Sequence, residues 1–137
     1  MKRSLLLLFT ALLLSSCASL PLGGGNEPRI VVVRNLSGAD IATVTLRESA
    51  SGQHASGFGS ISPVPAGIAQ VYVRGTDPPA FPRTIMVEWV DNEGRTHVKE
   101  LSLSKALKDA TGESGEALMI EIGPYEEVLV FIEKHPK

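Results

Sequence analysis

Much of the chain alternates between apolar and polar residues with a period of two, the pattern of half-buried β-strands. Residues 41–47 alternate in this way. In residues 84–90, Ile85, Val87 and Trp89 share one face, and in residues 117–122 one face carries Leu118, Ile120 and Ile122. Residues 128–132 are apolar on both faces, which predicts a strand in the interior of a sheet. The full set of predicted strands covers residues 30–34, 41–47, 58–61, 68–74, 84–90, 95–103, 117–122 and 128–132.

Turn-forming residues separate these strands. Residues 91–94 (DNEG) predict a hairpin loop, and residues 104–110 suit one short helix that ends before Gly112. The pattern gives about seven or eight short strands with turn signals every 8–12 residues. It predicts an all-β fold, a small antiparallel β-sandwich with one short helix.

The spacing of the turn residues supports this fold. Asn35, Ser37-Gly38, Pro65-Ala66-Gly67 and the Trp89 hairpin with Asp91 and Gly94 resemble the punctuation of small secreted Ig-like or transthyretin-like sandwich domains. The resemblance implies a fold and no activity, because such folds carry many functions.

The first sixteen residues have a different pattern. Lys2 and Arg3 precede a block of leucines that runs to Leu14, followed by two serines. This is the layout of a secretory signal peptide, and the block is shorter than the roughly 20 apolar residues of a membrane-spanning helix. We therefore expect three parts: a signal peptide at 1–16, a cysteine and flexible linker at 17–28, and a β-sandwich domain at 29–137.

The single cysteine follows this segment directly. Leu14-Ser15-Ser16-Cys17 resembles the lipobox of bacterial lipoproteins. The resemblance implies that Cys17 becomes the mature N-terminus and carries acyl chains such as palmitate. It also implies an outer-membrane location facing the periplasm, since residue 18 is Ala rather than the Asp that favours inner-membrane retention.

Composition narrows the classes of function. Removing residues 1–16 changes the formal net charge from −2 to −4, which argues against a nucleic-acid partner. One cysteine permits no intramolecular disulfide, and three histidines about forty residues apart predict no metal site. A G-x-S-x-G nucleophile motif is absent. We expect neither enzymatic activity nor a cofactor.

The class of function that remains is the binding of another molecule. The proline-rich segment 75–83 places Phe81 between prolines, near Asp77 and Arg83, and a stiff loop loses little entropy on binding. Phe81 is therefore a candidate exposed anchor, unless it closes the end of the sandwich. Tyr72 is a second candidate. Trp89 alternates in phase with its apolar neighbours and is expected in the core, whereas His97 is expected to face solvent.

We therefore expect a lipid-anchored, non-enzymatic binding or structural module of the bacterial cell envelope, with an envelope protein as its partner. Two alternatives stay open. Pro82 and Val87-Glu88-Trp89 resemble a feature of immunity lipoproteins that inhibit secreted antibacterial lipases. A carrier of small lipophilic ligands would need a cavity between the inward faces of residues 68–74 and 84–90.

Overall fold

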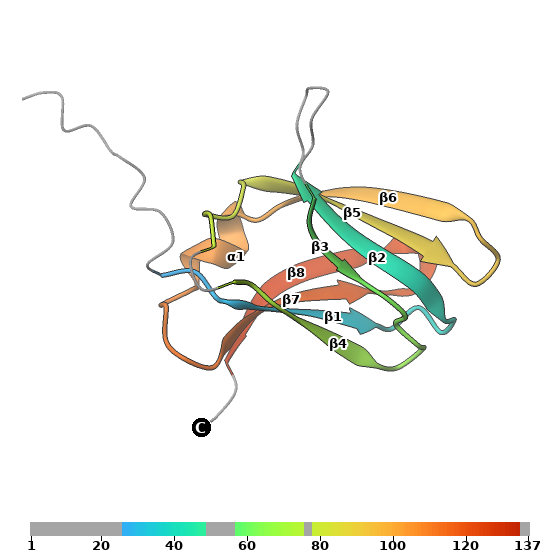
Figure 1. Ribbon diagram of the computed structural model, residues 1–137, viewed down its shortest axis with the longest axis horizontal. Helices are drawn as coiled ribbons and strands as arrows, with labels where there is room; N and C mark the ends of the chain where they lie inside the picture. The colour runs from blue at the N-terminus through green and yellow to red at the C-terminus, as the bar shows by residue number, and fades with distance from the viewer. Residues whose placement is uncertain (1–25, 49–56, 76–77, 135–137) are drawn as a thin grey trace, which may run out of the picture.

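The computed structural model describes residues 26–48, 57–75 and 78–134, so Cys17 and Asp77 lie outside the described residues. Two four-stranded sheets face each other, and a short helix lies at the end of the sandwich where the first strand begins (Figure 1). The elements are β1 (Ile30–Asn35), β2 (Ile41–Glu48), β3 (Gly57–Ile61), β4 (Ala69–Val73), β5 (Thr84–Asp91), β6 (Thr96–Ser102), α1 (Ser104–Lys108), β7 (Glu116–Ile122), the 3-10 turn η1 (Pro124–Glu126) and β8 (Val128–Lys134).

The strand order is β4-β1-β7-β8 in one sheet and β3-β2-β5-β6 in the other. The all-β sandwich with one short helix is therefore confirmed. Five of the six strand pairs are antiparallel, while β1 and β7 are parallel with Val32 opposite Met119. A parallel pair must be joined through other structure, and here the whole second sheet lies between the two strands in sequence.

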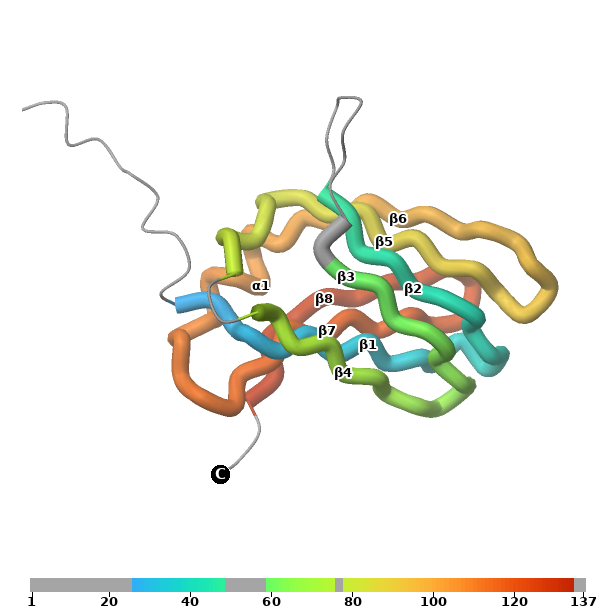
Figure 2. The backbone as a smooth tube through the Cα atoms, in the orientation of Figure 1, coloured from blue at the N-terminus to red at the C-terminus, as the bar shows by residue number. Residues whose placement is uncertain are grey.

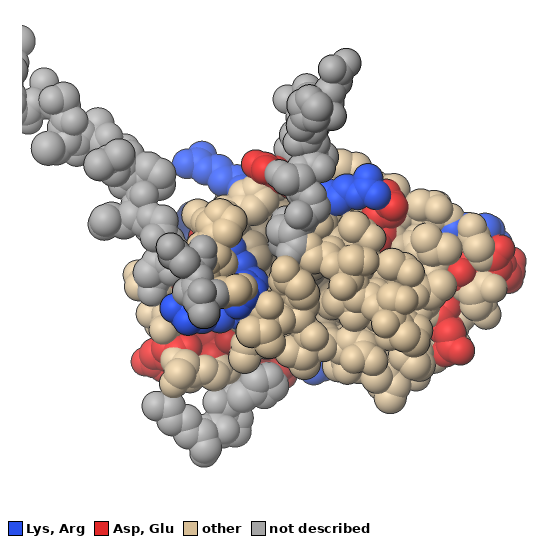
Figure 3. All heavy atoms as spheres, viewed as in Figure 1, with Lys and Arg blue, Asp and Glu red and all other residues tan. Residues whose placement is uncertain are grey.

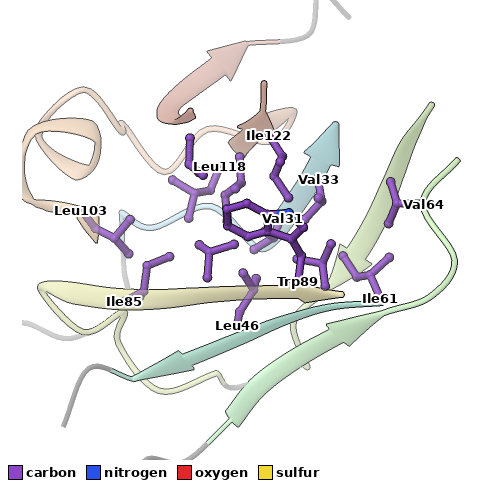
Figure 4. Close-up of a cluster of buried hydrophobic side chains, with 14 of the residues drawn as sticks. Val31, Val33, Leu46, Ile61, Val64, Ile85, Trp89, Leu103, Leu118 and Ile122 are labelled. Atoms are coloured by element: carbon purple, nitrogen blue, oxygen red, sulfur yellow. The ribbon is translucent and has the colours of Figure 1, made fainter. Parts of the chain in front are cut away.

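The core lies between the two sheets and follows the alternation of the sequence. Alternate residues of β5 and β7 point inward, as do Val44 and Leu46 of β2, and Trp89 is buried among them as expected (Figure 4). A register shift between Ile41 and Thr43 places Ile41, rather than Ala42, in the core. The fully buried side chains of the core include Val31, Val33, Val44, Leu46, Ile85, Val87, Leu118, Ile120 and Ile122. At about 0.8 kcal/mol per buried CH₂, these positions are a main source of the fold's stability.

The expectation of an interior strand at 128–132 is wrong. β8 is an edge strand of its sheet, and Leu129 on its outer face is 61% exposed. β7 has the interior place between β1 and β8, with Ala117 and Met119 buried on the face opposite Leu118, Ile120 and Ile122. Phe131 and Ile30 pack over these residues on the outer face of the sheet.

A buried asparagine fixes the corner where β1 turns toward β2. Asn35 donates from its Nδ2 to the carbonyl oxygens of Ala39 (2.7 Å) and Val64 (2.8 Å), and its Oδ1 accepts from the backbone N–H of Ser37 (3.0 Å). The Asn35 side chain is fully buried, so these bonds replace the hydration that its amide has lost.

Candidate functional site

Phe81 is not an exposed anchor, because its side chain is only 7% exposed. The guanidinium of Arg74 lies 3.6 Å from the centre of its ring, and the Phe81 backbone N–H donates to Glu27 Oε2 at 2.9 Å. Arg74 also donates to the carbonyl of Pro79 and pairs with Glu27. Residues 78–83 therefore close one end of the sandwich, with a cation–π contact between Arg74 and Phe81 at the centre.

The other predicted binding residues do not join Phe81 on an exposed surface in the described part of the chain. Tyr72 is half-buried and faces inward, where its ring lies so close to Gly59 that a Cβ there would be 3.3 Å away. Arg83 is exposed, and its carbonyl accepts from the backbone N–H of Leu103. Asp77 lies outside the described residues.

The opposite end of the sandwich has an unusual turn between β7 and β8. Tyr125 (φ 57°) and Glu126 (φ 61°) are consecutive non-glycine residues in the left-handed region. Each such residue costs on the order of 1–3 kcal/mol, and such strain gathers at functional sites. The turn is closed by the Gly123 N–H, which donates to the Glu127 carbonyl at 2.7 Å. It leaves Tyr125 95% exposed. We name residues 123–127 the Tyr125 turn.

A histidine ties this turn to the other sheet. His97 Nδ1 lies 2.6 Å from Glu126 Oε1, and His97 Nε2 lies 2.9 Å from Asp91 Oδ2. The imidazole stacks on the indole of Trp89, with ring centres 5.2 Å apart and planes 16° apart. Arg95 donates from Nε to the same Asp91 oxygen at 2.9 Å. We name His97, Asp91 and Glu126 the His97 clasp.

The contacts within the clasp shift the pKa values of His97 and Asp91 so that the charged form of each is favoured. Hydrogen bonds to Asp91 and then Glu126 raise the pKa of His97 above its usual value. The hydrogen bond from His97, reinforced by Arg95, holds the pKa of Asp91 well below its usual range. Hydrogen bonding to the charged form of a group is what shifts its pKa in this direction. The contacts therefore favour the imidazolium form of His97.

This arrangement is suited to positioning rather than to catalysis. Both ring nitrogens of His97 contact carboxylate oxygens of this chain, so neither is directed toward a site where another molecule could bind. The two carboxylates lie on different sides of the ring and do not converge on one point. Within the described ranges, no group of three or more His, Cys, Asp and Glu residues could hold a metal ion. The clasp fixes the place of the Tyr125 turn.

The sequence analysis missed this site. Trp89 and His97 are directly opposite each other in the β5–β6 hairpin, a pairing that follows once the loop at Asp91 is placed. That register could have placed His97 on the inward face with Trp89 instead of toward solvent. The contact with Glu126 joins the two sheets, and no short-range pattern contains it.

A cavity of about 520 Å³ lies at the end of the molecule where β1 begins. Its walls are residues 27–30 and 112–116, so it lies outside the core between the sheets. Glu116 beside it is buried, and its carboxylate accepts from the backbone N–H groups of Thr111 (2.9 Å) and Gly112 (3.0 Å). These bonds hold the loop that enters β7.

Comparisons with known proteins add little to this geometry. No family model matches the sequence, and no curated protein matches it. An NMR structure of a protein from Eubacterium rectale has a TM-score of 0.39 and 9% sequence identity, over 82% of this chain and 97% of that one. Similarity at this level shows neither family nor function. In the described part of the chain, no helix has the length and apolar character needed to cross a membrane.

Proposed function

We propose that this protein is a non-enzymatic binding module of the bacterial cell envelope, anchored by lipid at Cys17 in the outer membrane and facing the periplasm. Its partner is an envelope protein that it contacts through the Tyr125 turn. The lipobox-like sequence at residues 14–17 supports the anchor. The observation that carries the binding site is the 95% exposure of Tyr125 on a strained turn held by the His97 clasp.

Tyrosine at such a position has a clear energetic use. Tyrosine is enriched among the residues that dominate protein interfaces, because it brings a large contact area with little rotamer entropy to lose. A turn already fixed by hydrogen bonds loses little further freedom on binding. The strained backbone at Tyr125 and Glu126 has no role in the core, since both side chains are exposed.

The surroundings of Tyr125 indicate the charge of the partner. Glu126 and Glu127 adjoin it in the turn, and Glu93 is exposed in the nearby β5–β6 hairpin. Acidic atoms are visible at this end of the molecule in Figure 3. A partner surface with an apolar pocket bordered by Lys or Arg would complement this end and would associate faster at low salt.

The alternatives have less support. Val87 and Trp89, which carry the resemblance to immunity lipoproteins, are core residues and are not available to a toxin. The inward residues of β5 belong to the core between the sheets, and the cavity at residues 27–30 and 112–116 lies away from the inward faces that a lipophilic carrier would need.

The test compares two exposed positions in the full-length membrane-anchored protein. A photo-crosslinking amino acid at residue 125 should give a discrete adduct with an envelope protein, and the same residue at position 98 should not. Val98 is a suitable control because it is half exposed and next to His97 in β6.

With the partner identified, Tyr125→Ala should weaken binding about 30-fold, as expected for a central aromatic contact worth about 2 kcal/mol. Val98→Ala should leave binding within about twofold. Equal loss in both variants, or no loss in Tyr125→Ala, would refute the assignment of the binding site to this turn.

A further inference from the structure

Among the described residues, no strand pairs with the outer edge of β4, and the backbone groups of this edge follow a fixed pattern. The Asn35 N–H donates to the Ile68 carbonyl and the Arg74 N–H to the Arg29 carbonyl, both across the β1–β4 pair. Antiparallel pairs alternate, so Ile68, Gln70, Tyr72 and Arg74 direct their backbone groups toward β1. Ala69, Val71 and Val73 therefore direct their N–H and C=O groups away from the sheet.

The side chains along this edge are apolar and exposed. Val71 is 59% exposed and Val73 is 66% exposed, and β4 has no charged residue. Arg74, which follows the strand, is buried against Phe81 and paired with Glu27. β3 and β4 lie side by side at one flank (Figure 2), and Figure 3 shows this flank as a continuous uncharged area.

The other outer strands are protected against pairing. β6 has Lys99 and Glu100, and β8 ends in Glu133 and Lys134. β3 has an irregular register with β2 at Leu46/Arg47. Charges, bulges and prolines are the usual means of preventing edge-to-edge association. β4 has none of them.

We propose that β4 is a self-association surface, on which β4 of a second copy of this chain pairs antiparallel about a two-fold axis at Val71. In this register Val71 faces Val71, Ala69 faces Val73, and Gln70 faces Tyr72. The outward N–H and C=O groups of each copy meet those of the other copy. The two four-stranded sheets join edge to edge into one continuous sheet.

The charge pattern favours a second copy as the occupant. Each cross-strand pair in this register is neutral, and β-branched residues meet at the axis, where such pairs stabilise a sheet. The same operation on β6 about Val98 or Lys99 would place a charged residue opposite a like charge or an apolar residue. An isologous contact of this kind closes after two copies and leaves no free β4 edge.

The first experiment measures the mass of the full-length protein in detergent by light scattering, at several concentrations. The wild type should be a dimer, and Val71→Lys should raise the dissociation constant at least tenfold, because two ammonium groups would meet at the axis. Leu129→Lys is the matched control, since Leu129 is equally exposed on the edge strand β8. It should remain a dimer. Circular dichroism melting should show that both variants are folded.

The second experiment uses Val71→Cys under mild oxidation. Residues that face each other in a hydrogen-bonded antiparallel pair have Cα atoms about 5.5 Å apart, within disulfide range. Val71→Cys should give a covalent dimer, and Leu129→Cys should give no more covalent dimer than the wild type.

A monomeric wild type, or equal cross-linking at both positions, would overturn the proposal. It would also be overturned if Val71→Lys reduced binding to phospholipid vesicles without changing the mass, because the face would then belong to the membrane.

Discussion

His97 shows how one side chain can couple stability to pH. Its pKa is raised in the folded protein, so its contribution is complete below about pH 6.5 and is lost as the pH rises through the raised value. The pKa of Asp91 is lowered, so its contribution is present above about pH 4 and is lost as the pH falls further. The clasp therefore stabilises the fold most between about pH 4 and pH 6.5.

His97→Gln should remove this dependence. Glutamine keeps hydrogen-bonding atoms but cannot become a cation, so urea unfolding should show the largest loss of stability near pH 5.5 and a smaller loss at pH 8.5. Trp89, the single tryptophan, stacks on His97 and can report the titration by fluorescence. The midpoint should lie above about 6.5 in the wild type and fall toward that value in Asp91→Asn. A loss of stability that is equal at both pH values would contradict an imidazolium clasp.

The sequence predicts correctly whether a residue is buried when the residue lies in a strand with a clear period of two. Trp89 was predicted in the core because it is in phase with Ile85 and Val87, and it is buried. Phe81 lies in a segment without periodicity, so the sequence left both an exposed and a buried position open. Its burial depends on Arg74 and Glu27, which are brought to it by tertiary structure.

At the scale of elements, the sequence pattern predicts where the strands lie along the chain. It does not predict their order within the sheets. β8 is apolar on both faces and yet is an edge strand, while β7, whose residues 117–120 are also apolar on both faces, is interior. The outer face of β7 is buried because Phe131 and Ile30, on its two neighbours, pack over Met119 and Ala117. The sequence of one strand does not show whether side chains of neighbouring strands will bury its outer face.

Leu118 and Leu129 give a direct test of these places. Leu118 is fully buried in β7, whereas Leu129 is 61% exposed in β8. Leu118→Ala should lower the free energy of unfolding by about 2–4 kcal/mol, since it removes core contacts and leaves a cavity. Leu129→Ala should change it by less than about 0.5 kcal/mol. Urea unfolding followed by circular dichroism measures both. Similar losses in the two variants would show that β8 is not an edge.

At the scale of the whole molecule, three regions of the sandwich have different properties. The core between the sheets gives stability, the Tyr125 turn at one end offers an aromatic side chain, and β4 at one flank offers a neutral edge. β1 begins at the end closed by Arg74 and Phe81, opposite the Tyr125 turn (Figure 1). A tether that enters through residue 26 would therefore leave the Tyr125 turn directed away from the membrane.

The proposed tether depends on Cys17, and its loss should separate anchoring from folding. Cys17→Ala removes the thiol that would be acylated, so the protein should move from the membrane fraction to the soluble periplasmic fraction. Its thermal midpoint should not change, because residues 26–134 contain both sheets. Two or more acyl chains anchor a protein stably, whereas one chain binds only marginally. Mass spectrometry of the wild type should find a mature chain that begins at residue 17 with acyl groups attached.

Ser16→Ala keeps a small residue before the cysteine and should remain membrane-bound. A Cys17→Ala protein that stays in the membrane fraction would show that a different part of the chain provides the attachment.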